Sequence, residues 1–167
     1  MKLYRDVLLI PKFNNMNIIE EIRKDCDELF RILEPHITIV FPFLDDITDE
    51  ELISNIKNYF KDKDKFYVKF SGVSYSEDNY IFLNCIEGKE DIVKIHDDLY
   101  NKYFFEHLGK RKYVPHITIG QTFNCTKEQI NKINSMKNEF ECYIDTVMIE
   151  KIGINEESIV LETIKLN

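Results

Sequence analysis

The chain has 167 residues, of which 44% are hydrophobic, and its 22 basic and 30 acidic side chains give a formal net charge of −8. A chain of this length and apolar content can bury one sizeable core, so we expect a single domain over residues 1–167. The acidic balance excludes a non-specific binder of long nucleic acids, because such a protein needs a basic surface that displaces counterions from phosphates.

The first half of the chain carries five periodic segments: a strand over 3–11, a helix over 17–33, a strand over 36–43, a helix over 48–60 and a strand over 66–75. Pro11 ends the first strand, and Pro35 forbids continuation of the first helix. Asn14, Asn15 or Asn17 can cap the start of that helix. Thr48 and Glu51 fit a capping box at the start of the second helix.

The second half repeats this order with a strand over 80–86, a helix over 89–107, a strand over 116–123, a helix from 126 to 137 and strands over 140–152 and 158–165. The strand over 80–86 is expected to form a hairpin with the strand before it. Gly109 stops the helix over 89–107. Thr126 and Gln129 form a second capping box, ten residues after His116.

One pentapeptide, Pro-His-Ile-Thr-Ile, occurs twice, at 35–39 and 115–119. Because side chains alternate along a strand, each copy places its histidine and threonine on one face, roughly 6.5 Å apart, and its isoleucines on the other. The paired side chains are therefore His36 with Thr38 and His116 with Thr118. A strand that is only structural does not need such a pair, and still less needs it twice.

The equivalent positions of the two pentapeptides indicate a weak internal duplication, with halves over about 1–76 and 79–167. We expect an α+β fold that is bilobal, with two pseudo-symmetric halves of mainly antiparallel sheet and flanking helices. A central groove between the halves is the natural place for the two His–Thr faces.

Two opposed histidines suit displacement at phosphorus, which needs a base beside the entering oxygen and an acid beside the leaving oxygen. The hydroxyls of Thr38 and Thr118 can donate to the non-bridging phosphate oxygens. This chemistry requires neither a metal nor a cofactor. The residues therefore predict phosphodiester cleavage by acid–base catalysis.

The doubled motif and the order of elements resemble the 2H phosphoesterase superfamily, in particular bacterial proteins similar to 2′-5′ RNA ligases and cyclic phosphodiesterases. The resemblance covers nearly the whole chain and implies His36, Thr38, His116 and Thr118 as catalytic residues. It implies action on a cyclic phosphate, of a small nucleotide or an RNA end, or on a 2′-5′ linkage. It further implies that His116 activates water and His36 protonates the leaving oxygen, although the pseudo-symmetry also allows these roles to exchange.

Alternatives remain beside this hydrolase hypothesis. The groove can bind a nucleotide or phosphate without turnover, or the same residues can serve 2′-5′ RNA ligation. Duplication alone can also have preserved an apolar strand that happens to keep His and Thr. A metal site is disfavoured, because Asp45 and Asp46 lie beyond the strand and no third ligand has suitable spacing.

The cysteines are Cys26, Cys85, Cys125 and Cys142, and they lack C-x-x-C and Cys/His metal spacings. We expect four free thiols in a cytoplasmic protein. No N-terminal signal and no apolar run of about 18 residues occurs, so no membrane partner is expected. We expect a monomer.

The remaining candidate residues have weaker patterns. His96 is interpreted as a partly buried or helix-face residue and His107 as a partner of the helix C-terminus. The basic cluster at Lys110, Arg111 and Lys112 is interpreted as exposed loop charge rather than a second phosphate site. Four aromatic residues could stack on a base at the groove mouth, although we interpret most of them as core: Phe41, Phe43, Tyr113 and Phe123.

Overall fold

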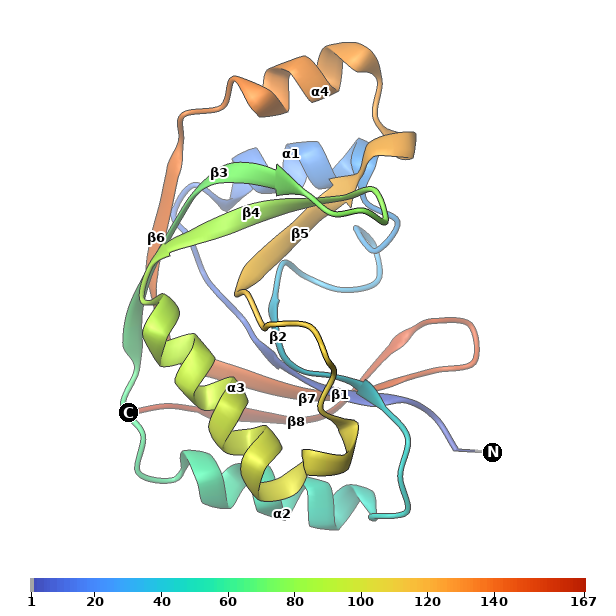
Figure 1. Cartoon of the computed structure of the whole chain (residues 1–167), viewed down its shortest axis with the longest axis vertical. Coiled ribbons are helices and arrows are strands. Elements are labelled where there is room, and N and C mark those ends of the chain that lie inside the picture. The colour runs from blue at the N-terminus through green and yellow to red at the C-terminus, as the bar shows by residue number, and fades with distance from the viewer. Residues whose placement is uncertain (1) are drawn as a thin grey trace.

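The computed structural model describes residues 2–167 and contains two four-stranded antiparallel sheets (Figure 1). The first sheet consists, in spatial order, of β2 (Ile37–Phe43), β1 (Arg5–Leu9), β7 (Thr146–Ile152) and β8 (Ser158–Lys165). The second sheet consists, in spatial order, of β5 (His116–Gln121), β4 (Tyr80–Glu87), β3 (Phe66–Tyr75) and β6 (Glu139–Ile144). The β3–β4 hairpin is confirmed.

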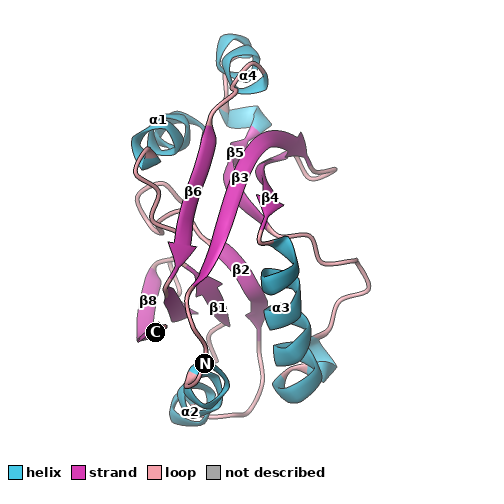
Figure 2. Ribbon diagram, turned by 90° about the vertical axis from the view of Figure 1, so that its left-hand side faces the viewer, coloured by secondary structure: helices cyan, strands magenta, loops and turns pink. Residues whose placement is uncertain are grey.

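The sheets are covered by α1 (Met16–Cys26), α2 (Asp49–Phe60), α3 (Lys89–Tyr103) and α4 (Lys127–Asn134), with 3₁₀ turns at η1 (Phe105–His107) and η2 (Thr122–Asn124). Helix α2 packs near β8 and α3 packs near β2, whereas α1 packs on β5 and α4 near β3 (Figure 2). Helices α1 and α3 therefore each follow a strand of one sheet and cover the other. Within residues 2–167, no helix is long and apolar enough to cross a membrane.

Thr48 and Thr126 cap their helices, but only Thr126 completes the predicted capping box, and Asn15 at the start of α1 makes no side-chain capping bond. The Thr48 hydroxyl accepts a hydrogen bond from the Glu51 amide at 3.1 Å. The Thr126 hydroxyl accepts one from the Gln129 amide at 3.2 Å, and the Gln129 side chain accepts one from the Thr126 amide at 2.7 Å. These bonds satisfy amide groups that have no partner inside the first turn of a helix.

The duplicated order appears as β1-α1-β2-α2-β3 and β4-α3-β5-α4-β6, and the α+β fold is confirmed. The symmetry ends at β3 and β6, the last strand of each repeated half. Both belong to the second sheet, where they pair, and β7 and β8 fill the equivalent places in the first sheet. The short β3–β4 connection forces those two strands to pair. Each sheet therefore contains strands from both halves, and the boundary expected between residues 76 and 79 falls inside the second sheet.

The helix expected over 17–33 ends at Cys26. The Asp27 carboxylate accepts hydrogen bonds from the Arg23 side chain at 2.6 Å and from the Leu29 amide at 3.0 Å. A side chain that bonds nearby backbone in this way offers an alternative to helical hydrogen bonds. The residues after Asp27 therefore form turns that lead to β2.

Two further predicted elements are shorter than expected. The single strand expected over 140–152 is wrong, because the chain leaves the second sheet as β6 ends and enters the first as β7 begins, with Asp145 between them. The helix expected over 89–107 ends at Tyr103. His107 lies in the following 3₁₀ turn, where its Nε2 is 3.6 Å from Asp45, so it does not sit at the end of α3.

One hydrophobic cluster joins the two sheets. Val7 and Ile37 of the first sheet and Val68 and Ile117 of the second are fully buried in it. A smaller buried cluster consists of Leu8, Ile10, Leu33 and Met148. Leu8 is the cross-strand partner of Thr38, so this small cluster lies beside the first His–Thr pair.

The expectation of four free thiols is wrong for two of them. Cys26 and Cys125 form a disulfide with a Cα–Cα distance of 5.0 Å, while Cys85 and Cys142 are free. Helix α1 approaches β5 closely at its last residue, where a Cβ on Gly120 would lie 2.7 Å from the Cys26 Cβ. That approach brings together two cysteines 99 residues apart in sequence, a pairing that spacing cannot indicate.

A buried pair of carboxyl groups crosses β1 and β7. Asp6 and Glu150 are direct cross-strand partners, and both are almost fully buried. Burial, followed by the neighbouring Glu150, raises the pKa of Asp6 to about 8, and burial also raises the pKa of Glu150. The Ser158 hydroxyl donates to Glu150. The two carboxyl groups therefore retain a proton near neutral pH, since two like charges cannot be buried together without a large cost.

We expect Glu150→Gln to stabilise the protein at alkaline pH and to have little effect at pH 5. The folded pair keeps a proton that the unfolded chain releases above pH 3.8, the usual pKa of Asp. The free energy of unfolding therefore falls as the pH rises from 3.8 to about 8. The neutral amide removes the like charge. Thermal unfolding at pH 5 and pH 9 checks this, and an equal difference between variant and wild type at both values would contradict it.

Candidate active site

The two His–Thr pairs lie on the edge strands of their respective sheets. His36 immediately precedes β2 and Thr38 lies within it, while His116 and Thr118 both lie in β5. Strand β2 is the edge of the first sheet and β5 the edge of the second, and the two edges contact each other although they are not paired (Figure 1). The fold therefore brings together two motifs that are eighty residues apart in sequence.

Both histidine rings are fixed in the same way. The His36 Nδ1 is 2.9 Å from the Glu34 carbonyl oxygen, and the His116 Nδ1 is 2.8 Å from the Val114 carbonyl oxygen. A carbonyl oxygen only accepts, so each Nδ1 carries a proton and donates it. In the neutral ring, Nε2 is then the nitrogen with the free lone pair, and it can accept or, once protonated, donate a proton.

Both histidines have a lowered pKa. Burial is the main cause for His36, and the charges of Arg23 and His116 act in the same direction, while Glu34 and Asp27 oppose them. Burial is also the main cause for His116. The rings are therefore neutral at pH 7 in the free protein. An anion held between them would favour the protonated form and raise the pKa.

A buried ion pair positions the turns that lead to His36. The Arg23 guanidinium donates to the Asp27 carboxylate at 2.6 Å and to the Leu33 carbonyl at 2.6 Å. The side chains of Arg23 and Asp27 are only 1% and 3% exposed. Pro35 follows, and the chain enters β2 as an extended strand. Sequence patterns gave no reason to select Arg23, because a lone arginine on an amphipathic helix normally faces solvent.

The segment before His116 also contacts the first motif. The Tyr113 hydroxyl donates to the Thr38 carbonyl at 2.8 Å, and the Phe41 amide donates to the Tyr100 hydroxyl at 3.1 Å. The Tyr113 ring stacks on His96 with ring centroids 3.8 Å apart and the planes at 2°. Of the two positions expected for His96, partly buried or on a helix face, the structure shows a buried one, from which the ring supports Tyr113.

Removing the Tyr113 hydroxyl should therefore alter the relative placement of the two motifs. We expect Tyr113→Phe to lower the turnover rate by about one order of magnitude, because small misplacements of reacting groups are costly. Tyr59→Phe is a matched control, since the Tyr59 hydroxyl donates to the Asp98 side chain at 2.9 Å and bonds neither motif. Steady-state kinetics of both variants provide the measurement, and equal effects would contradict the expectation.

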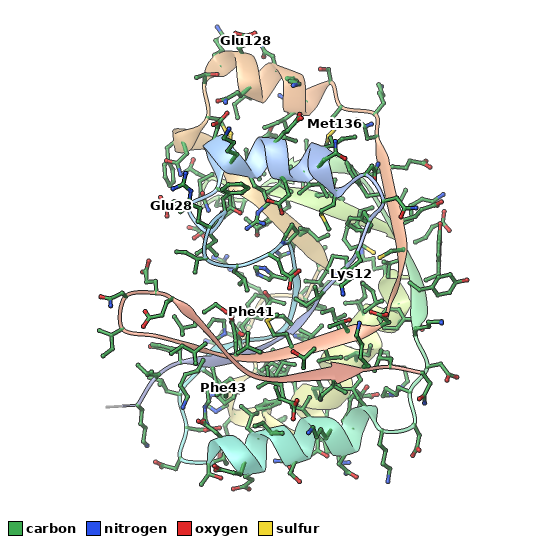
Figure 3. All side chains as sticks on the ribbon, turned by 180° about the vertical axis from the view of Figure 1, so that it is seen from behind. Lys12, Glu28, Phe41, Phe43, Glu128 and Met136 are labelled. Atoms are coloured by element: carbon green, nitrogen blue, oxygen red, sulfur yellow. A yellow bond between two sulfur atoms is a disulfide. The ribbon has the colours of Figure 1, made fainter. Side chains whose placement is uncertain are left out.

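The four aromatic residues proposed for base stacking divide into two groups. Phe43 is in the core and Tyr113 contacts Thr38, so neither is free to stack on a ligand. Phe41, labelled in Figure 3, and Phe123 in η2 are both exposed, Phe41 by 44%. Sequence reasoning overlooked Tyr80 and Phe82, although the alternation of β4 places both on one face. Phe82 lies directly across from Thr118.

The charged candidates lie outside this arrangement. Arg111 is exposed and is 3.9 Å from Asp78. Asp45 pairs with Arg5, and Asp46 pairs with Lys2. Among residues 2–167, no three His, Cys, Asp or Glu side chains are placed to hold a metal ion together.

Two cavities lie away from the His–Thr pairs. One of about 410 Å³ separates α1 from α4 and includes Ile22, Ile133 and Met136 in its lining (Figure 3). The other, of about 580 Å³, lies beside the first half of α3 and includes Lys112 and Tyr113. None of the four motif side chains lines either cavity.

Comparison with known proteins identifies the family. Residues 11–151 match the model of the 2'-5' RNA ligase superfamily, and the chain belongs to this superfamily. A Bacillus pumilus protein named "Putative phosphoesterase" is 29% identical over 119 residues, which cover 69% of this chain and 68% of that protein. A protein of the same description from Halalkalibacterium halodurans is 23% identical and covers 96% of this chain and 95% of its own length.

Solved structures show the same fold at low sequence identity. LigT of E. coli in its apo form superposes with a TM-score of 0.63 at 10% identity, over 100% of this chain and 99% of LigT. TT0787 of Thermus thermophilus superposes with a TM-score of 0.66 at 14% identity, over 98% of both chains. The two-sheet α+β architecture is therefore that of the LigT-like proteins.

Proposed function

We propose that the chain is a phosphoesterase that hydrolyses a cyclic phosphate of a small nucleotide or RNA end, or a 2′-5′ phosphodiester. The observation that carries this proposal is the equivalence of the two histidines. Each lies at the start of an edge strand, donates from Nδ1 to a backbone carbonyl two residues earlier, and keeps Nε2 for proton transfer. The curated relatives named as phosphoesterases and the family match support the reaction class.

The proposed reaction needs one histidine in each protonation state. The neutral Nε2 of one ring removes a proton from water as the water oxygen bonds to phosphorus. The bond from phosphorus to the leaving oxygen breaks, and the protonated Nε2 of the other ring gives that oxygen its proton. The hydroxyls of Thr38 and Thr118 donate to the non-bridging oxygens and stabilise the charge that develops there. Solvent returns both rings to their starting states.

The expected ligand is a small nucleotide. Crystal structures of E. coli LigT in complex with 3'-AMP, ATP and NADP+ show that a protein of this fold binds such molecules. The formal charge of −8 favours a small or terminal substrate over long RNA. We infer a soluble monomer acting without a bound metal.

The test is hydrolysis of each nucleoside 2′,3′-cyclic phosphate in the presence of EDTA, followed by chromatography of the products. We expect one nucleoside monophosphate isomer to accumulate with the wild type and none with the His36→Ala, His116→Ala double variant. Absence of turnover with every cyclic phosphate and every 2′-5′ dinucleotide, or turnover that survives in the double variant, would overturn the proposal. Thermal stabilisation by a nucleotide without product would instead identify a binding module.

A further inference from the structure

An aromatic row runs along β4 to the second His–Thr pair. The Tyr80 and Phe82 rings are stacked, with their planes at 6° and their centroids 6.3 Å apart. The Phe82 ring in turn contacts the His116 ring, with centroids 3.8 Å apart and planes at 30°. Two parallel rings of one strand therefore stand beside the tilted ring of His116, which carries a proposed catalytic nitrogen.

This row lies on the face of the second sheet opposite the core. Ile81 and Leu83 point into the hydrophobic core and are fully buried, so the alternation of β4 directs Tyr80 and Phe82 to the other face. Thr118 lies directly across from Phe82 on that same face. Tyr80 is 41% exposed, so the surface of its ring is open to a ligand.

The chemistry of the row matches a planar heterocycle. Aromatic rings that stand parallel and open to solvent favour stacking with another flat ring, whereas a sugar phosphate alone has no such surface. The row ends at His116, where the proposed reaction places the phosphate. A ligand that joins a flat ring to a phosphate through one sugar would span these two positions.

We propose that Tyr80 and Phe82 form a base-binding subsite for a nucleotide whose phosphate lies between His36 and His116. The proposal rests on the proposed function and adds the place and the kind of base recognition. The energy of stacking depends on the size of the base and not on its hydrogen-bonding edge. The subsite therefore distinguishes purines from pyrimidines and does not distinguish adenine from guanine.

Phe41 is the alternative residue on which the base could stack. It is 44% exposed on β2, three residues after Thr38, and its ring lies 6.2 Å from that of Tyr113 at an angle of 78°. A single ring in edge contact with its neighbour presents a smaller flat surface than the parallel rings of Tyr80 and Phe82. Phe41 therefore serves as the alternative arm of the experiment.

The experiment compares binding of 3'-AMP and inorganic phosphate by calorimetry. We expect Tyr80→Ala to weaken 3'-AMP binding at least fivefold and to leave phosphate binding unchanged. Tyr143→Ala is the matched control, because Tyr143 is an exposed tyrosine of the same sheet that pairs with Tyr67, away from His116. Weakening by Phe41→Ala and not by Tyr80→Ala, or equal losses for 3'-AMP and phosphate, would overturn the subsite.

Kinetics with different bases separate this subsite from the proposed function. We expect the wild type to prefer adenosine and guanosine 2′,3′-cyclic phosphates over the cytidine and uridine compounds by about threefold or more. Tyr80→Ala should remove this preference. Hydrolysis of glycerol 1,2-cyclic phosphate as fast as the adenosine compound would reject the subsite and leave the phosphoesterase activity standing. Binding of 3'-AMP through Tyr80 without any turnover would support the subsite and reject the activity.

Discussion

Replacing either His36 or His116 by alanine is expected to lower the turnover rate by two to four orders of magnitude. In the proposed reaction each ring supplies one of the two proton transfers, and a positioned acid or base commonly contributes a factor of that size. The lowered pKa of both rings favours the neutral form that a base needs, and a phosphate anion bound between them would raise the pKa of the ring that serves as the acid. The Michaelis constant should change little by comparison.

The double variant His36→Ala, His116→Ala should be only slightly slower than either single variant. The effects of replacing two groups that act in the same step are strongly non-additive. Once one proton transfer is lost, the other contributes little to the rate. His107→Ala is the matched control, since His107 contacts Asp45 and Phe43 outside the two motifs. Single-turnover rates on one cyclic nucleotide provide the measurement, and full independence of the two losses would contradict concerted action.

Replacing Arg23 by methionine is expected to destabilise the protein by about 3–5 kcal/mol, the cost of leaving a buried charge without its partner. The Asp27 carboxylate would lose the guanidinium at 2.6 Å, and the Leu33 carbonyl would lose its donor. Because residues 27–35 lead directly to His36, the variant should also lose activity at temperatures where it remains folded. Urea unfolding at pH 7 measures the loss of stability.

The chain provides a close control for this pair. Lys94 and Asp98 have the same four-residue spacing on a helix and a similar distance of 2.9 Å, but the Lys94 side chain is 69% exposed. Solvent-exposed pairs of this kind contribute roughly 0.3–0.5 kcal/mol. Lys94→Met should therefore cost far less than Arg23→Met. Comparable losses for the two variants would show that burial does not determine the effect.

The sequence allowed much of the local structure to be predicted. The alternation within Pro-His-Ile-Thr-Ile correctly separated the core-facing isoleucines from His36 and Thr38, because strand geometry makes that separation a local property. The capping residues Thr48 and Thr126 were equally predictable, since a cap bonds an amide three residues away. The catalytic role of the two His–Thr pairs stays a prediction.

The long-range relations were not predictable from periodicity. The segment over 140–152 is rich in strand-forming residues on both sides of Asp145, and the change of sheet at that residue depends on the strands with which β6 and β7 pair. Cys26 and Cys125 meet because α1 crosses to β5. The signal for Tyr80 was present in the alternation of β4, but its position beside His116 depends on the pairing of β4 with β5.

The strand order of the first sheet has a consequence for the newly synthesised chain. Strand β1 precedes β7 by most of the chain's length, yet it lies between β2 and β7 in the sheet, and β7 ends at Ile152. Until that late segment emerges, β1 has one unpaired edge and its apolar residues are incompletely covered. The first His–Thr strand therefore belongs to a sheet that cannot close until β7 has been synthesised. The proposed activity should appear only after β7 has emerged, and a nascent chain stalled before residue 146 should be inactive and vulnerable to proteases.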